Sequence, residues 1–361
     1  MRTLKKVVFY INAIHEGGAE RVMINLARQF AGGGVETLLI TSFVDTWEYS
    51  VPDGVKRLVL DKKIYKSKIS RNLHRIFALR KVLKKEKPDC VISFMAEPNY
   101  RSLIATFGLK TKTVISVRNS PKKEYPGKVG SILAKILLPT ADGCVFQTND
   151  AKEWFVKKLQ DKSVIIPNAI ADKFYGLEWH PIKGNIITIG RLVEQKNHKL
   201  LISAFEKLHD EHPDITLSIY GSGNMESELE SFINESNLSD CVFLKGPTQD
   251  VPAVLQDANM FVMSSDYEGM PNALMEALTV GVPCVSTDCP CGGPKMLIQQ
   301  EENGLLVQCG DLHMLYQSMK KLYEDELLQN KFHSRSVESM MDFKENAIYL
   351  KWNEFVNRII N

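Results

Sequence analysis

The stretch SSDYEGMPNALMEA, residues 264–277, decides the fold of this chain. The apolar run from Ala258 to Met263 precedes it and is typical of a buried parallel strand. A turn is predicted at Glu268 and Gly269, and Pro271 occupies the position expected for the first residue of a helix. Strand, tight turn and helix N-terminus follow one another. A helix N-terminus presents unpaired N–H groups and a partial positive charge, which suit a phosphate group.

Two carboxylates accompany this predicted phosphate site. Glu268 lies in the turn itself, and Glu276 follows about two helical turns later. Together they could hold a nucleotide-sugar, with the diphosphate on the helix amides, the sugar hydroxyls on Glu268 and the ribose hydroxyls on Glu276. The same spacing occurs in ordinary strand–helix units whose glutamates are solvated. The intervening GMPN, residues 269–272, favours a functional turn because it demands a special backbone.

This stretch resembles the Glu-x7-Glu signature of the retaining glycosyltransferases of family 4, in the subgroup that makes bacterial surface polysaccharides or lipid-linked oligosaccharides. The resemblance implies the α/β fold called GT-B, in which two Rossmann-like, doubly wound parallel-sheet domains face a central cleft. It implies an acceptor-binding domain over residues 1–168 and a nucleotide-sugar-binding domain over residues 169–340. A C-terminal helix within residues 341–361 would then pack back on the first domain.

Two further motifs are compatible with phosphate binding. Arg191 and Lys196 stand five residues apart after Gly190, at the end of a predicted strand, and are either two exposed cations or a pair that reaches one diphosphate. Gly17 and Gly18 stand where the first strand becomes a helix, and glycine there allows a close approach of phosphate or close helix packing. The resemblance implies that both motifs contact the donor diphosphate.

Arg118 follows the predicted strand 113–117 at its carboxyl end, where α/β folds place their ligands. Many members of the family have a histidine near this point that contacts the donor sugar, whereas this chain has Arg118 and Asn119. A guanidinium suits recognition of an acceptor phosphate or hydroxyl. A structural surface arginine is the alternative.

The resemblance carries these assignments over to individual positions. The residues expected to be catalytic are Glu268, Arg191, Lys196 and Arg118. The residues expected to bind the donor are Gly17, Gly18, Gly190, Arg191, Lys196, Gly221, Lys245, Gly246, Pro247, Glu268, Gly269, Met270, Pro271, Asn272 and Glu276. The chain has no Asp-x-Asp motif, so we expect no metal ion and no cofactor besides the donor substrate.

Length and composition limit the class of protein. The 361 residues exceed one typical core and indicate two domains, and 44% hydrophobic with 24% charged residues is typical of a globular protein. No apolar run approaches the roughly 20 residues that span a bilayer. Seven cysteines without framework spacing indicate reduced thiols in a cytoplasmic protein. Cys289 and Cys291 form a C-x-C pair, but two ligands do not make a structural zinc site.

The charge is divided unevenly along the chain. Residues 1–163 contain 30 lysines and arginines against 15 aspartates and glutamates, a net charge of +15, and residues 164–361 contain 15 against 28, a net charge of −13. Basic residues crowd into a probable amphipathic helix over residues 56–87, and a second basic, apolar-faced segment covers residues 121–139. Such segments are either solvated helices or surfaces that lie on anionic lipid.

The sequence therefore predicts a transferase that moves a hexose or N-acetylhexosamine from a uridine diphosphate sugar to a glycan acceptor, with retention of the anomeric configuration. By the resemblance, the acceptor is linked to polyprenyl diphosphate and the pathway makes surface polysaccharide. We expect a cytoplasmic protein held peripherally on the anionic inner face of the plasma membrane by its basic segments, without nucleic acid as a partner.

Two other classes of function were weighed. Nucleotide-sugar epimerases share the fold, but they lack the combination of Arg191, Lys196 and the EGMPN segment at residues 268–272. A non-enzymatic basic protein that binds a membrane or nucleic acid is the other alternative. Binding of single-stranded nucleic acid would require aromatic residues interleaved with the cations, and residues 62–87 contain only Tyr65 and Phe77.

Overall fold

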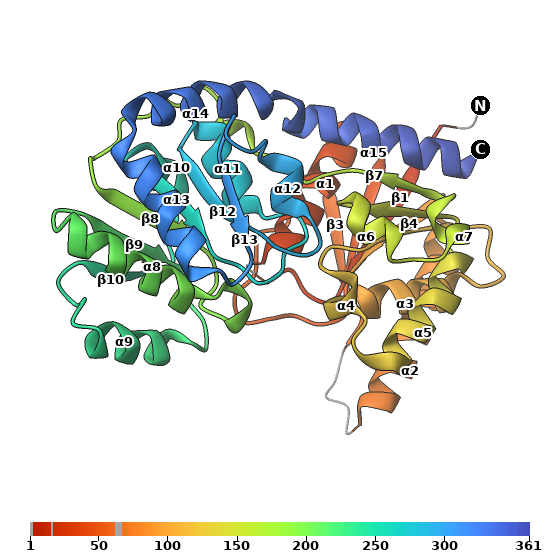
Figure 1. Ribbon diagram of the computed structural model, residues 1–361. Helices are drawn as coiled ribbons and strands as arrows, with labels where there is room; N and C mark the ends of the chain where they lie inside the picture. The colour runs from red at the N-terminus through yellow and green to blue at the C-terminus, as the bar shows by residue number, and fades with distance from the viewer. Residues whose placement is uncertain (1–2, 16, 62–66) are drawn as a thin grey trace. The chain divides into compact units, whose positions relative to one another are not determined.

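A computed structural model describes residues 3–15, 17–61 and 67–361. The chain divides into two compact units. Unit 1 consists of Met1–Ala169 and Asn346–Asn361, and unit 2 consists of Ile170–Glu345. Each unit has one sheet whose neighbouring strands all pair in parallel (Figure 1). Two doubly wound parallel sheets confirm the predicted α/β class.

The sheet of unit 1 has seven strands in the order β3-β2-β1-β4-β5-β6-β7. Its order reverses between β1 and β4, which is the mark of a doubly wound sheet. Unit 1 contains, in chain order, β1 (Lys6–Ile11), α1 (Gly18–Gly32), β2 (Glu36–Thr41), β3 (Val55–Val59), α2 (Lys68–Glu86), β4 (Cys90–Phe94), α3 (Ala96–Thr106), β5 (Lys112–Ser116), α4 (Pro121–Glu124), α5 (Gly127–Leu137), η1 (Leu138–Thr140), β6 (Gly143–Phe146), α6 (Asn149–Glu153), α7 (Lys157–Gln160), β7 (Ser163–Ile165) and most of α15 (Glu345–Ile360).

The sheet of unit 2 has six strands in the order β10-β9-β8-β11-β12-β13. It reverses between β8 and β11. Unit 2 contains, in chain order, η2 (Asp172–Phe174), β8 (Asn185–Ile189), η3 (Glu194–Lys196), α8 (His198–Glu211), β9 (Thr216–Tyr220), α9 (Glu226–Glu235), β10 (Val242–Gly246), α10 (Val251–Gln256), β11 (Met260–Met263), α11 (Asn272–Val280), β12 (Cys284–Asp288), α12 (Gly293–Leu297), β13 (Leu305–Gln308), α13 (Leu312–Glu324), α14 (Glu326–Ser339) and η4 (Met341–Phe343).

The central strands are continuous apolar runs because helices cover both faces of each sheet. Successive side chains of a strand point to opposite faces. In β1, Phe9 joins the cluster that includes apolar residues of α1 and α15, whereas Tyr10 joins the cluster that includes apolar residues of α2. In β8, Ile186 and Ile187 likewise belong to two different clusters of unit 2. A strand buried on both faces gives no polar alternation in its sequence.

The predicted helix over residues 56–87 is wrong at its beginning. Val55–Val59 forms β3, an edge strand paired in parallel with β2. The helix starts only at Lys68, where the Ser67 hydroxyl accepts a hydrogen bond from the Ser70 N–H at 3.2 Å. The strand does not have the apolar pattern of a buried strand because it contains Lys56 and Arg57. An edge strand tolerates such charged side chains. Residues 62–66 of this predicted helix lie outside the described residues.

The helix that ends the chain is a structural part of unit 1. Its apolar face contributes Ile348, Trp352, Phe355 and Val356 to the main core of that unit. The Trp352 ring lies with its centroid 5.8 Å from that of Phe94 at the end of β4. Helix α15 therefore closes one face of the seven-stranded sheet. Among the helices of the described residues, none has the length and apolar character needed to cross a bilayer.

We predict that Trp352→Ala destabilises unit 1 by about 3–5 kcal/mol, because it removes a fully buried aromatic side chain and leaves a cavity. Leu350 lies two residues away on the same helix and is exposed, so Leu350→Ala is the matched control and should stay within about 0.5 kcal/mol of the wild type. Urea unfolding followed by circular dichroism measures both. Equal stability of the two variants would contradict a core role for α15.

Candidate functional site

The loops after β8 and β11 meet at the point where the sheet of unit 2 reverses its order. Open α/β sheets bind their ligands outside the carboxyl ends of the strands at such a point. The first loop, residues 190–197, carries the predicted cations, and the second, residues 264–271, carries the predicted turn carboxylate. Two motifs that are about 70 residues apart in the sequence are therefore brought to one place by the strand order.

Lys196 and Glu268 are in direct contact. The Lys196 Nζ lies 2.7 Å from the Glu268 Oε1, and the Ser265 hydroxyl donates a second hydrogen bond to the same oxygen at 2.9 Å. The side chains of the pair are only 16% and 10% exposed. An ion pair that is mostly removed from water interacts more strongly than one on the surface. The site thus holds one ammonium and one carboxylate in a fixed geometry.

Hydrogen bonds between the two loops fix this geometry. The Asp266 N–H donates to the Gln195 carbonyl at 2.9 Å, and the Asn197 side-chain amide donates to the Asp266 carboxylate at 2.8 Å. The Ser264 hydroxyl donates to the Lys196 carbonyl at 2.9 Å. The loops therefore behave as one structural piece, and the positions of the cation and the carboxylate depend on each other.

Two glycines allow the backbones around this piece to approach closely. Gly221, after β9, has a φ of +143°, and a Cβ there would lie 1.9 Å from the Gly190 carbonyl oxygen. A Cβ on Gly293 would lie 1.8 Å from the Gly269 carbonyl oxygen. Any side chain at these positions would push apart the loops that surround Glu268.

Helix α11 starts beside the carboxylate. Its first residue is Asn272, one position later than predicted, and Pro271 is the N-cap. The nine-residue helix therefore directs the positive end of its dipole toward the turn that carries Glu268. Glu276 lies in the second turn of α11 and is buried. The cation, the near carboxylate and the helix start predicted from the sequence thus lie together in unit 2.

The other predicted donor residues of unit 2 lie around the same edge of the sheet. Arg191 is exposed on the loop after β8. Gly246, at the end of β10, has a φ of +70°, and its carbonyl accepts a hydrogen bond from the loop after β9 at 2.9 Å. Pro247 follows it. Lys245 points its ammonium over a neighbouring phenylalanine ring, 4.5 Å from the ring centroid.

Gly17, Gly18 and Arg118 belong to unit 1. Helix α1 starts at Gly18, at the end of the connection that follows β1, with Gly17 as an extended N-cap. A Cβ on Gly17 would lie 2.3 Å from a carboxylate oxygen of Glu20. The carboxylate of Glu20 in turn lies 3.2 Å from the His15 Nε2. Gly17 and Gly18 thus stand at the switch point of the first sheet.

Arg118 is buried. Its guanidinium lies over the Phe94 ring, 4.5 Å from the centroid, and donates hydrogen bonds to the Asn168 side-chain oxygen and to the Ser116 hydroxyl, the latter at 3.4 Å. Burial lowers the pKa of Arg118 to about 9. The arginine predicted from its position after β5 is therefore no solvated surface cation.

The carboxyl group of Glu124 lies beside this arginine. Its Oε2 accepts hydrogen bonds from the backbone N–H groups of Arg118 and Asn119 at 3.0 and 3.1 Å. Burial raises the pKa of Glu124 to about 7. Across the part of the chain that the structure describes, the Arg118 Nε and the Glu124 Oε1 are buried atoms without a hydrogen-bond partner. One buried donor and one buried acceptor are thus left without a hydrogen-bond partner here.

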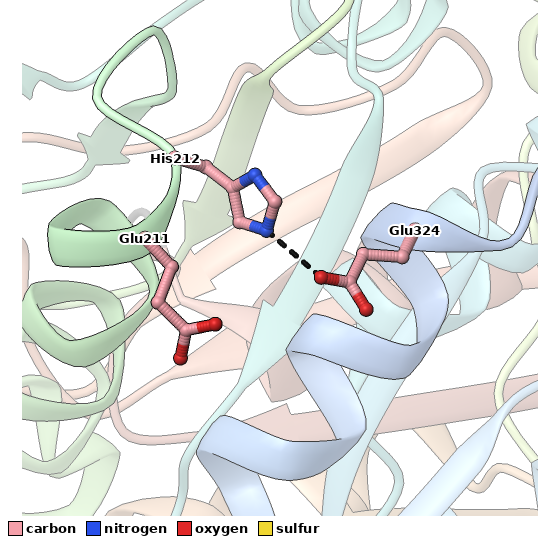
Figure 2. A group of neighbouring side chains, drawn as sticks. All are labelled: Glu211, His212 and Glu324. Carbon is pink, nitrogen blue, oxygen red and sulfur yellow. Dashed lines mark hydrogen bonds and ion pairs between the residues drawn. The ribbon is translucent and has the colours of Figure 1, made fainter.

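The described residues contain one group of three potential metal ligands, Glu211, His212 and Glu324 (Figure 2). The His212 Nε2 lies 3.0 Å from the Glu324 Oε1. The Lys320 ammonium bonds to Glu211 and lies 4.0 Å from Glu324, where it already supplies a positive charge. The group lies at the C-terminal ends of α8 and α13, at the opposite edge of the sheet from Glu268. We interpret it as an ion-pair network that joins these two helices.

Several residues that shape the site were not predicted from the sequence. Ser265 holds the Glu268 carboxylate, and Asn197 joins the two loops. The Glu268 N–H donates to the Pro290 carbonyl at 2.7 Å, which places the loop after β12 against the turn. The available signal in the sequence was that Ser265 and Asn197 lie on the loops that follow predicted strands. The partners of Asn197 and of the Glu268 N–H could not be identified because each lies on a different loop, whereas Ser265 lies on the same loop as Glu268.

Comparison with known proteins agrees with this architecture. The model of the family described as Glycosyltransferase Family 4 matches residues 16–174, and that described as Glycosyl transferases group 1 matches residues 179–346. An uncharacterized glycosyltransferase of Methanocaldococcus jannaschii is 28% identical over 88% of this chain and 92% of its own length. The GalNAc-alpha-(1->4)-GalNAc-alpha-(1->3)-diNAcBac-PP-undecaprenol alpha-1,4-N-acetyl-D-galactosaminyltransferase of Campylobacter jejuni is 27% identical over 99% of this chain and 100% of its own.

Among solved structures, HepE of Anabaena in complex with UDP and glucose superposes with a TM-score of 0.83 at 17% identity, covering 97% of this chain and 98% of that one. This likeness confirms the predicted GT-B fold. The two family models follow each other along the chain and together reach from residue 16 to residue 346. The chain therefore belongs to the glycosyltransferases of the family 4 type.

Proposed function

We propose that this glycosyltransferase transfers a hexose or N-acetylhexosamine from a uridine diphosphate sugar to a glycan acceptor with retention of the anomeric configuration. The observation that carries the proposal is the contact between Lys196 and Glu268 at the start of α11. A cation and a helix N-terminus suit the diphosphate, and a carboxylate suits the sugar hydroxyls. The UDP and glucose bound in the Anabaena structure support a donor of this class.

The proposed reaction breaks the bond between the anomeric carbon and the diphosphate oxygen. The acceptor hydroxyl attacks that carbon on the face from which the diphosphate leaves. The bonding electrons depart with the diphosphate, and one of its oxygens receives the hydroxyl proton. Lys196, Arg191 and the first amides of α11 would stabilise the negative charge that grows on the leaving group. Glu268 orients the sugar, and Glu276 binds the ribose.

Arg118 is proposed to bind a hydroxyl group of the substrate. Its unpartnered Nε–H and the Glu124 Oε1 offer one donor and one acceptor, which a hydroxyl satisfies. The neighbouring carboxyl group makes a phosphate a poorer ligand, because an ionised Glu124 would repel it. Of the two ligands that the sequence allows, phosphate and hydroxyl, the surroundings of Arg118 favour the hydroxyl.

The acceptor is proposed to be a glycan on polyprenyl diphosphate, in the synthesis of a surface polysaccharide at the inner face of the plasma membrane. The name of the Campylobacter relative describes such a lipid-linked acceptor. Helix α5 supports membrane contact, because it buries only one residue, Ala134, and has no acidic side chain. Its exposed apolar residues are Val129, Ile132, Leu133 and Ile136. Its lysines and those of α2 suit anionic lipid.

We predict that Glu268→Gln lowers the rate of sugar transfer at least about a hundredfold, because it removes the charge that orients the sugar in the transition state. Glutamine keeps the shape of the side chain and its bond from Ser265 but leaves Lys196 without its ionic partner, so the melting temperature should fall while the variant still folds. A panel of UDP-sugars with release of UDP as the readout measures the rate. Near-native turnover by the variant would contradict the proposed role of Glu268.

We predict that Lys196→Ala weakens UDP binding about tenfold or more, because a charge-assisted contact with the diphosphate is lost. Lys199 is three residues away and pairs with Glu228 at 2.6 Å, outside the site. Lys199→Ala is the matched control and should bind UDP as the wild type does. Isothermal titration calorimetry with UDP separates the two, and equal affinities would contradict the assignment.

For the membrane contact, the double variant Ile132→Glu with Ile136→Glu should weaken binding to vesicles that contain phosphatidylglycerol about tenfold or more, because buried apolar contact is replaced by like charge. Both residues are exposed, so the fold should tolerate the change. Leu350→Glu, on an exposed position of α15, is the control. Vesicle flotation measures binding, and a double variant that still floats with the vesicles would exclude α5 as the contact.

A further inference from the structure

Trp47 is an exposed aromatic residue of unit 1, in a segment that follows the carboxyl end of a strand. It lies in the segment between β2 and β3, six residues after β2 ends at Thr41. Its side chain is 76% exposed, which is unusual for a large amphipathic ring. The carboxyl ends of β1 and β2 form this edge of the sheet, so Trp47 stands beside the region where α/β sheets bind ligands.

The segment that carries Trp47 is firmly held. Its neighbour Glu48 receives two hydrogen bonds from the Arg57 guanidinium, at 2.6 and 2.9 Å, and forms a backbone bridge with His15. The Tyr49 N–H donates to the Ile14 carbonyl at 2.9 Å. The bonds from Arg57 also keep the pKa of Glu48 below its usual value. A ring on such a support loses little freedom when it binds a ligand.

Polar groups that can recognise hydroxyls lie on the same segment as Trp47 and on the chain that is bridged to it. Asp45, two residues before Trp47, has an exposed carboxylate whose Oδ2 lies 4.0 Å from the His15 Nδ1. The other ring nitrogen of His15 lies 3.2 Å from the Glu20 carboxylate. The side chains of His15 and Asp45 remain 45% and 41% exposed. An exposed aromatic ring on the same loop as a carboxylate that faces an imidazole suits a sugar, which has one apolar face and a rim of hydroxyls.

The charge of the segment selects among possible ligands. Residues 43–54 contain three acidic residues, Asp45, Glu48 and Asp53, and no lysine or arginine. The domain around them is strongly basic, with a net charge of +15 over residues 1–163. Glu48 is paired with Arg57, so Asp45 and Asp53 give the segment a negative charge that disfavours anionic lipid, nucleic acid and phosphate. A neutral, hydroxyl-rich ligand suffers no such repulsion.

We propose that Trp47 is the stacking platform for a neutral sugar ring of the acceptor glycan, with Asp45 and His15 binding the hydroxyls of that ring. This inference rests on the proposed function and assigns a subsite to the acceptor. It makes the aromatic ring a determinant of which glycans the enzyme elongates. The diphosphate end of the acceptor would have to lie elsewhere on the basic surface of the domain.

The experiment measures acceptor KM and kcat for wild type, Trp47→Ala and Trp47→Phe. The probes are glycosyl diphosphates on a short, water-soluble prenyl chain that carry one to three N-acetylhexosamine units. We expect Trp47→Ala to raise the acceptor KM about tenfold, which corresponds to about 1.4 kcal/mol. Trp47→Phe keeps a ring and should recover most of the loss. Phe107→Ala is the control, because Phe107 is an 81% exposed aromatic residue at the C-terminal end of α3.

A second readout does not depend on turnover. The chain has four tryptophans, Trp47, Trp154, Trp179 and Trp352, so 5-fluorotryptophan labelling gives four fluorine resonances, and Trp47→Phe identifies that of Trp47. The acceptor found active should shift this resonance, and phosphatidylglycerol vesicles should not. If the wild type transfers the sugar but Trp47→Ala has an unchanged acceptor KM and the acceptor does not shift the Trp47 resonance, the inference is wrong and the proposed function stands. A shift only with vesicles would assign Trp47 to the membrane. Absence of any transfer by the wild type would overturn the proposed function as well.

Discussion

The hydrogen bonds between the loop after β8 and the loop after β11 are the constraint on which the site of unit 2 depends. Asp266 is bonded to Gln195 and to Asn197, so the two loops cannot move separately. The Lys196–Glu268 pair adds a mostly buried charge contact at the same place. Removing one partner of such a pair leaves a desolvated charge behind, which costs more than the loss of a surface contact. Stability and ligand geometry are therefore coupled at this edge of the sheet.

Much of this arrangement could be predicted from the sequence. Continuous apolar runs identified the central strands, and Pro271 after a glycine turn located the start of α11 to within one residue. The strand β3 was missed because its charged residues follow the pattern of an edge strand rather than that of a buried one. The chain from Asn149 to Gln160 forms two short helices, α6 and α7, separated by residues 154–156. Local propensity does not reveal such a break.

The surroundings of Arg118 could not be predicted for a different reason. Its position after a strand was readable, but Phe94 and Asn168, which surround its guanidinium, come from strand ends 24 residues before and 50 residues after it. Only the strand order β4-β5-β6-β7 brings these ends together. The same holds for the partners of Glu268. Sequence reasoning identified the candidate groups, whereas the contacts that orient them depend on the topology.

The division of the chain has a consequence for its biosynthesis. Unit 1 needs residues 346–361 to cover Phe94 and the face of β1, yet the ribosome makes all of unit 2 first. Unit 2 is one uninterrupted segment and has its complete set of strands as soon as residue 345 has left the exit tunnel. Domains generally fold as units during synthesis. One apolar face of the sheet in unit 1 therefore stays uncovered until α15 has been made. A nascent chain halted before α15 would expose this face and would be a natural substrate for chaperones.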